Sequence, residues 1–211
     1  MVPIPTSPGD VAALIRRRDP AFNSVIKASG NPPSRRGVPV DQRFGSLARS
    51  ITFQLLATRA AETIHARVIG LCSGDVSVDA VLNVGAEQLK TAGLTLTKAQ
   101  AMVDLAQDVR AGRVRLSRHG CMSDAEVLRE ITTVRGIGPW TAQMYLMSTL
   151  ARADVWPAGD FGVRNGWTIA HGLDEMISEK DLRAAGERFV GVRSALAWYC
   201  WQTVHLHRAT N

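Results

Sequence analysis

Apolar residues recur along most of the chain at the three- to four-residue spacing of a helical face, and strand-like alternation is scarce. The clearest stripe follows Asp41 and consists of Phe44, Leu47, Ala48, Ile51 and Leu55. Similar stripes follow one another toward the C-terminus, where Leu196, Tyr199, Cys200 and Thr203 share a face. The pattern predicts an all-α fold of roughly ten helices.

Capping residues and helix breakers predict where these helices begin and end. Thr97 with Gln100, and Ser123 with Glu126, have the form of a capping box, the first of them opening a helix that stops at Gly112. The other predicted boundaries are, in chain order, residues 11–18, a start near Thr58, Ser77 to Gly85, 139–151, 161–169 with Asp160 as N-cap, and a helix capped by Ser178.

Residues 132–146, TTVRGIGPWTAQMYL, place two glycines around one isoleucine at the mouth of an apolar helix. Gly136 and Gly138 can adopt positive φ, and Pro139 suits the first turn of a helix. The stretch therefore predicts a helix, a tight hairpin and a second helix, with main-chain amides facing outward at a helix N-terminus, where an anion can bind. The alternative is a plain turn between helices in which the glycines only serve packing.

The composition of the chain favours a polyanionic partner and argues against several classes of metal site and membrane segment. The 211 residues are 45% hydrophobic, enough for one sizeable core or two small ones, and the net charge is +6 with a pI of about 9.8. Cys72, Cys121 and Cys200 lie far apart, which argues against an iron–sulfur cluster or a zinc knuckle and is typical of reduced thiols in a cytosol. The start, 1–10, has no apolar run that would act as a secretory signal, and the longest apolar run, 195–201, is too short to cross a bilayer.

The hairpin residues Val134, Gly136, Ile137, Gly138, Thr141 and Ala142, with WPAGDFGVR at 156–164, resemble the helix-hairpin-helix motif and the following loop of DNA-repair glycosylases. Stretches 47–55, 93–99 and 193–201 also resemble this superfamily, and within it the 3-methyladenine DNA glycosylase II group. The resemblance implies two helical subdomains with a cleft between them. One is formed by 1–40 with 152–211, and the other by 41–151.

Asp160 stands where the superfamily has its catalytic aspartate. On the residues alone an N-cap is the simpler role, since aspartate is a preferred cap. The resemblance implies that its carboxylate stabilises the positive charge that builds on the sugar as the base leaves, and orients or deprotonates a water. Asp154 lies outside the matched position and is expected to be a structural or surface group.

By the same resemblance, Trp140, Met144 and Val192 line the base pocket, where Trp140 stacks on a flipped, cationic base. Endonuclease III-like and 8-oxoguanine enzymes carry a lysine at the position of Trp140, so tryptophan there implies a monofunctional glycosylase that does not cut the strand. Met144 and Val192 replace aromatic residues, which leaves the base preference open. Trp198, Tyr199 and Trp201 are expected in the core, with one of them able to edge into the cleft.

The resemblance also implies the DNA contacts. Gly136, Ile137, Gly138 and Thr141 would bind a phosphate, and Gln54 with Leu55 would meet the minor groove, Leu55 as a wedge in the gap left by the flipped nucleotide. Core packing is the alternative for Leu55, because it continues the stripe of its helix. Main-chain oxygens of Thr132, Val134 and Ile137 would hold a monovalent cation, Na⁺ or K⁺, and no other cofactor is expected.

The function expected from these residues is excision of alkylated purines, of the 3-methyladenine and 7-methylguanine type, from duplex DNA by a monomer in the cytoplasm, nucleoid-associated in a bacterium or nuclear in a eukaryote. Three alternatives stay open: a non-catalytic DNA-binding module, a basic helical scaffold, and a glycosylase for oxidised or deaminated bases. The last would need an acid to help a neutral base leave, and the sequence offers no obvious one.

Overall fold

The computed structural model describes residues 7–34, 36–56 and 58–210, and within them every regular element is a helix, so the all-α prediction is confirmed. The elements are α1 (Pro8–Arg18), η1 (Pro20–Phe22), α2 (Asn23–Ser29), η2 (Val40–Gln42), α3 (Arg43–Phe53), α4 (Thr58–Leu71), α5 (Val78–Thr91), α6 (Leu96–Arg110), η3 (His119–Cys121), α7 (Asp124–Thr132), α8 (Pro139–Ser148), α9 (Phe161–Ala170), α10 (Glu179–Gly186), η4 (Glu187–Phe189) and α11 (Arg193–Thr210), where η marks a 3₁₀ helix.

The chain divides into two compact units, a terminal unit of Met1–Arg36 with Arg152–Asn211 and a central unit of Gly37–Ala151. The boundaries predicted from the sequence are 40/41 and 151/152. The predicted cleft between the subdomains stays a prediction.

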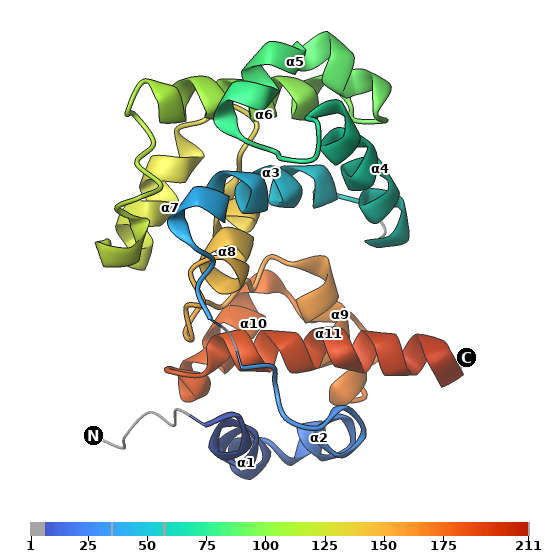
Figure 1. Ribbon diagram of the computed structural model, residues 1–211. Helices are drawn as coiled ribbons and strands as arrows, with labels where there is room; N and C mark the ends of the chain where they lie inside the picture. Colours follow the sequence, from blue (N-terminus) through green and yellow to red (C-terminus); the bar gives the residue numbers. More distant parts are fainter. Residues whose placement is uncertain (1–6, 35, 57, 211) are drawn as a thin grey trace. The chain divides into compact units, whose positions relative to one another are not determined.

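In the central unit α3 is the element around which the others pack. It contacts α4, α6 and α8, while α5 lies along α6 and α7 lies against α8 (Figure 1). The predicted stripe explains this position, because Leu47, Ala48 and Ile51 are fully buried and Phe44 nearly so. One helix therefore buries its apolar face against three neighbours at once, and these neighbours include both α8 and α6, which carry the features described below.

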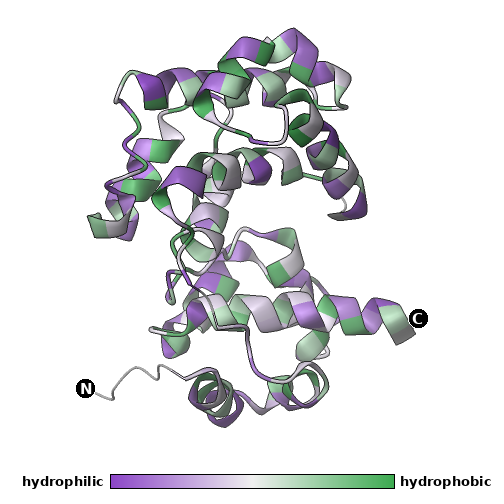
Figure 2. Ribbon diagram, viewed as in Figure 1, coloured by the Kyte–Doolittle hydropathy of each residue, from purple (hydrophilic) through white to green (hydrophobic). Residues whose placement is uncertain are grey.

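In the terminal unit α9 packs along α11, and α2 and α1 also contact α11 (Figure 1). The approach of α9 to α11 requires Gly166, since a Cβ there would overlap the main chain of Cys200. Tyr199 is fully buried and donates its hydroxyl proton to the carbonyl oxygen of Gly30, at 2.9 Å. The hydropathy colouring shows the corresponding alternation of apolar and polar residues along the helices (Figure 2).

Most predicted caps are confirmed. Ser123 and Glu126 form the reciprocal capping box, and Ser77, Asp160 and Ser178 are N-caps whose side chains accept a main-chain N–H.

Other predicted boundaries are wrong. The N-cap of α6 is Thr95, whose extended backbone lets its hydroxyl accept from Lys98 N, so the capping box of Thr97 with Gln100 does not form. The first helix begins at Pro8 under a Ser7 cap, and α8 ends at Ser148 instead of residue 151. Helix α5 continues past Gly85, which kinks it at a φ of 74°.

Candidate active site and nucleic-acid interface

The glycine hairpin connects α7 to α8 in the central unit. Val134 and Ile137 are 2% and 4% exposed and pin the turn to the core, with the main-chain N–H of Ile137 donating to the carbonyl oxygen of Val134 at 3.1 Å. Gly136 has a φ of +83°, and a Cβ there would lie 2.8 Å from the Cβ of Ala101 on α6. Gly138 has a φ of −92°, so only the first glycine uses the left-handed region that the sequence analysis allowed for both. Gly138 is the N-cap of α8, and its surroundings leave open space for a side chain.

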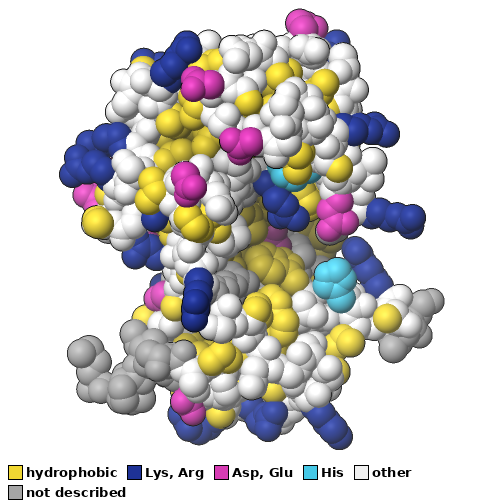
Figure 3. All heavy atoms as spheres, viewed as in Figure 1, with side chains coloured by type: hydrophobic (Ala, Val, Ile, Leu, Met, Phe, Trp, Pro, Cys, Tyr) yellow, Lys and Arg dark blue, Asp and Glu magenta, His cyan; other side chains and the backbone are white. Residues whose placement is uncertain are grey.

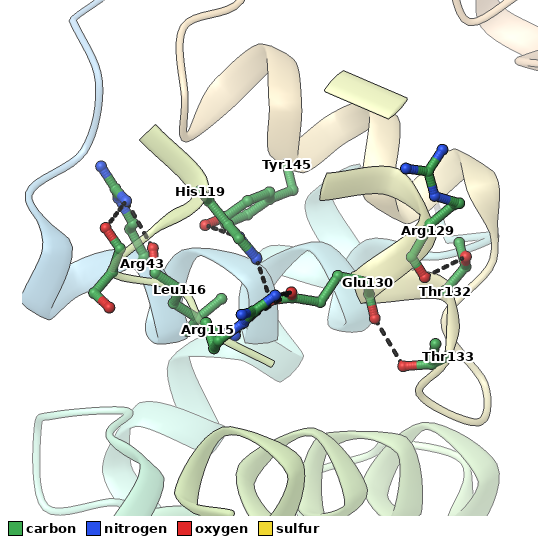
Figure 4. Close-up of polar contacts among 10 residues, drawn as sticks. Arg43, Arg115, Leu116, His119, Arg129, Glu130, Thr132, Thr133 and Tyr145 are labelled. Atoms are coloured by element: carbon green, nitrogen blue, oxygen red, sulfur yellow. Dashed lines mark hydrogen bonds and ion pairs between the residues drawn. The ribbon is translucent and has the colours of Figure 1, made fainter. Parts of the chain in front are cut away.

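A buried polar network fixes the helices on either side of this hairpin (Figure 4). His119 is fully buried, and its ring nitrogens lie 3.1 Å from the hydroxyl of Tyr145 on α8 and 2.9 Å from a carboxylate oxygen of Glu130 on α7. Burial lowers the pKa of His119. Burial also opposes the charge of Glu130, but hydrogen bonds from the Arg115 main chain and from His119 outweigh it, and the pKa of Glu130 is lowered. No local pattern in the sequence predicted a role for these residues.

Gln54 and Leu55 follow the last turn of α3. The side-chain amide of Gln54 donates to the carbonyl oxygen of Gly136 at 3.1 Å and to the hydroxyl of Thr141 at 2.8 Å. Gln54 thereby ties the end of α3 to the hairpin, and Thr141 is buried beneath it. Leu55 is fully exposed, at 103%, and has a φ of +53°, so the core-packing alternative is wrong for this residue. Its role as a DNA wedge stays a prediction.

Lys98 supports the same turn and was missed in the sequence analysis. Its ammonium group donates to the carbonyl oxygens of Thr52 and Gln54, at 3.1 and 2.5 Å, and burial lowers its pKa. A cation at the C-terminal end of α3 also complements the partial negative charge of that helix end. Because Ala101 of the same helix touches Gly136, α6 supports both the Leu55 turn and the hairpin.

Asp160 belongs to the terminal unit, where it caps α9 and is partly exposed. Its Oδ1 atom accepts the main-chain N–H of Val163 at 2.7 Å and the indole N–H of Trp201 at 2.9 Å. The loop before it is anchored by Trp156, which donates its own indole N–H to the carbonyl oxygen of Leu182. Local sequence therefore predicted the cap, whereas the contact with Trp201 joins residues far apart in the chain.

Of the other predictions for the terminal unit, some are confirmed and some are not. Asp154 accepts two hydrogen bonds from Arg193 and one from the main chain of Gly191, which gives it the structural role expected. Tyr199 lies in the core as predicted, while Trp198 and Trp201 are only partly buried. The sequence offered one signal for this difference: Trp201 falls off the apolar face formed by Leu196, Tyr199, Cys200 and Thr203.

The predicted base pocket draws on both units. Trp140 and Met144 lie one turn apart on α8, and both are partly exposed. Val192 precedes α11 in the terminal unit and is buried. The pocket formed by these three residues with Asp160 stays a prediction.

The predicted cation ligands lie in the hairpin. Thr132 is the last residue of α7, and Val134 and Ile137 follow in the turn. The carbonyl oxygen of Val134 accepts the N–H of Ile137 and retains a second lone pair, so it can also face an ion. Main-chain carbonyl oxygens are suitable ligands for a monovalent cation. The binding of such a cation here stays a prediction.

No family model matches the chain. Its sequence is 26% identical over 191 residues to DNA-3-methyladenine glycosylase 1 of Schizosaccharomyces pombe, covering 89% of this chain and 84% of the relative. Its structure is similar to that of the Schizosaccharomyces pombe 3-methyladenine DNA glycosylase Mag1 in complex with abasic DNA, with a TM-score of 0.87 and 25% identity over 93% of this chain and 97% of that one. The chain is similar to the helix-hairpin-helix DNA glycosylases in both sequence and fold. A DNA-3-methyladenine glycosidase from Bacillus halodurans is also similar, with a TM-score of 0.77 and 26% identity over 94% and 91% of the two chains.

On the face that Figure 3 shows, the charged side chains of the central unit are dispersed. On the visible face of the central unit, lysine and arginine side chains alternate with aspartate and glutamate (Figure 3). The three cysteines are free thiols, Cys72 and Cys200 buried and Cys121 exposed. Among the described helices none is long and apolar enough to span a bilayer.

Proposed function

We propose that the chain is a monofunctional DNA glycosylase that removes alkylated purines from duplex DNA by flipping the damaged nucleotide and hydrolysing its N-glycosidic bond. The observation that carries this proposal is the carboxylate of Asp160, held by two N–H donors at the start of α9. The names of the similar proteins, which are 3-methyladenine glycosylases, support the substrate class. We assign the chain to the 3-methyladenine DNA glycosylase II group and place it in base excision repair.

The chemistry follows from where charge develops. As the bond between sugar and base breaks, positive charge builds on the sugar, and an adjacent carboxylate stabilises that transition state and can orient or deprotonate the attacking water. An alkylated purine already carries a positive charge that it loses on leaving, so a strong general acid is not required. Trp140, in place of a lysine, offers no amine for a Schiff base, and the product is an abasic site in an intact strand.

The DNA contacts are supported by the geometry of the central unit. The exposed Gly136 and Gly138 at the start of α8 suit a phosphate, which needs only amides and a helix N-terminus. A fully exposed leucine beside that hairpin suits insertion into the stack of bases. A monovalent cation on the hairpin carbonyls would add a positive charge facing the same phosphate. We propose that the protein acts as a monomer on duplex DNA in the compartment that holds the genome.

Asp160→Asn tests the proposal, because asparagine is as good an N-cap as aspartate and its amide oxygen can accept the same two N–H groups. The wild-type protein, incubated with methylated duplex DNA, should release 3-methyladenine and 7-methylguanine, identified by chromatography. The variant should release them about 10²- to 10³-fold more slowly, as expected when a transition-state stabiliser is lost. Its affinity for DNA should be equal or higher, since a negative charge near phosphates is gone.

Each result distinguishes the alternatives. Normal release by Asp160→Asn would assign the chemistry to another group. DNA binding without release by the wild type would favour a non-catalytic module, and release of only neutral oxidised or deaminated bases would overturn the substrate class. Absence of any DNA binding would favour a helical scaffold.

A further inference from the structure

We propose that Trp201 is a positioning residue for Asp160, whose indole N–H holds the carboxylate in a single orientation. The inference rests on the proposed function, because it gives Trp201 a part in base release. It adds a residue that lies outside the loop in which Asp160 is found.

Two donors to Asp160 come from different elements. The N–H of Val163 belongs to the first turn of α9 and reaches Oδ1 at 2.7 Å, as in any N-cap. The indole N–H of Trp201 comes from α11 and reaches the same oxygen at 2.9 Å. One donor leaves the carboxylate able to rotate, whereas two donors on one oxygen, from two directions, define both side-chain torsions. The second oxygen is then aimed in a fixed direction.

The packing around this bond is built to permit it. A Cβ at Gly162 would lie 2.8 Å from Cδ1 of Trp201, 3.1 Å from its Nε1 and 3.1 Å from Oδ1 of Asp160. One turn further along α9, Gly166 allows its helix to touch the main chain of Cys200, the residue next to Trp201. Two glycines of α9 therefore face α11, the first making room for the indole and the second fixing the backbone that carries it.

The choice of an indole suits the chemistry. An N–H of tryptophan donates a hydrogen bond but carries no charge and does not titrate, so it orients the carboxylate without neutralising it. A lysine or arginine at the same distance would oppose the attraction between Asp160 and the cationic sugar. A tryptophan buried only for packing would not need its N–H directed at a carboxylate, and Trp201 is partly exposed.

The kinetic test compares Trp201→Phe with Trp198→Phe. Trp198 is a matched control, because it is a partly buried tryptophan on the same helix and packs edge-on against Tyr199. With methylated duplex, Trp201→Phe should lower the single-turnover rate at saturating protein by about 10- to 100-fold, the range expected for a misplaced catalytic group. Its Kd for a duplex with an abasic-site analogue should stay within about twofold of wild type, and Trp198→Phe should retain the wild-type rate within the same margin.

Gly162→Ala provides a second route to the same bond, since the added methyl displaces the indole. Its rate should fall like that of Trp201→Phe, and the double variant should be no slower than the worse single variant, because both changes remove one interaction. Additive losses would show that the two residues act independently and would overturn the proposal.

A spectroscopic readout tests the bond without base release. The indole ¹⁵N–¹H resonance of Trp201, identified by its loss in Trp201→Phe, should move strongly in Asp160→Ala, while the Trp198 resonance stays in place. An unmoved Trp201 resonance would overturn the inference. If the wild type releases no base, the proposed function fails and the inference falls with it. If the wild type releases base and Trp201→Phe does so equally fast, only the inference fails.

Discussion

Leu55 combines two features that a folded chain normally avoids. Its side chain is fully exposed, and its φ of +53° lies in the left-handed region, which costs a non-glycine residue about 1–2 kcal/mol. Lys98 nevertheless donates to the carbonyl oxygen of Gln54, and the side chain of Gln54 donates to Gly136, so hydrogen bonds hold the turn in this shape. A conformation that is unfavourable locally and is supported by its neighbours points to contact with a ligand, which under the proposed function is the stack of bases.

We therefore expect Leu55→Gly to separate stability from binding. Glycine relieves the left-handed strain but adds entropy to the unfolded chain, so the free energy of unfolding should stay within about 1 kcal/mol of wild type or rise. Affinity for a duplex with an abasic-site analogue should fall, as measured by fluorescence anisotropy. Ile51→Ala, a truncation in the core of the same helix, is the contrasting variant and should cost about 2–5 kcal/mol. A comparable loss in Leu55→Gly would show that Leu55 has a structural role.

Which site residues could be predicted depended on how local their signal is. The cap at Asp160 and the glycine hairpin were predicted from neighbouring residues, because a cap and a tight turn are local features, whereas the catalytic role of Asp160 was predicted only from the resemblance. The exposure of Leu55 was left open, since the residue continues an apolar stripe and only the end of α3 at Phe53 removes it from the core. The contacts of Trp201 with Asp160 and of Lys98 with Gln54 depend on tertiary packing, which no local pattern specifies.

At the scale of elements, the network of His119 and Glu130 joins η3 and α7 to α8, and both pKa shifts make acid destabilising. Burial lowers the pKa of His119 from 6.5, so as pH falls through that value the unfolded chain takes up a proton that the folded protein does not. The lowered pKa of Glu130 stabilises the folded state above 4.5, and this stability is lost as pH falls through the folded pKa.

We expect Tm to fall as pH is lowered from 7 to 5, and His119→Gln to make this dependence shallower, because it removes the titrating ring. The measurement is Tm by circular dichroism across that range. His205→Gln replaces an exposed histidine on α11 and should keep the wild-type slope. Equal slopes for wild type and His119→Gln would contradict the network as the source of acid sensitivity.

A substitution at the start of α8 should likewise change DNA affinity without lowering the stability of the fold. Gly138 occupies the N-cap in open space, where aspartate is a favoured residue, so Gly138→Asp should leave Tm unchanged or slightly higher. The added charge at the proposed phosphate site should weaken binding to all duplexes alike, damaged or not, because a phosphate contact carries no base information. Gly138→Ala controls for the side chain without the charge and should bind almost normally. A loss confined to particular sequences would contradict the assignment.

Helix existence was easier to predict than helix boundaries, and α6 shows why. Thr97 with Gln100 matches the capping pattern, but the N-cap is Thr95, because the backbone is extended at that residue. Two threonines so close in sequence present the same local chemistry, and the choice between them is made by packing. Gly85 likewise signals a break, yet the apolar positions on both sides let α5 resume after a kink.

At the scale of the whole molecule, the proposed roles divide between the two units. The hairpin, Gln54 and Leu55 belong to the central unit, and Asp160 with Trp201 belongs to the terminal unit. Changes at the first group should therefore act mainly on Kd, and changes at the second on the rate of base release. Trp140 and Met144 are the exceptions, since they belong to the central unit and are proposed to hold the base.

The net charge of +6 is typical of a protein that binds a polyanion, so salt should affect duplex affinity and the rate of base release differently. Each phosphate neutralised by the protein releases condensed counterions, so two such contacts alone would weaken duplex affinity by roughly tenfold between about 50 and 200 mM salt. Titrations of damaged and undamaged duplex should show equal slopes of log K against log salt, because the phosphate contacts are shared. The single-turnover rate at saturating protein should stay nearly constant over the same range, since the proposed action of Asp160 is on a base that is already bound. A salt-independent Kd would contradict phosphate binding, and a rate at saturation that falls in parallel with affinity would contradict the separation of the two roles.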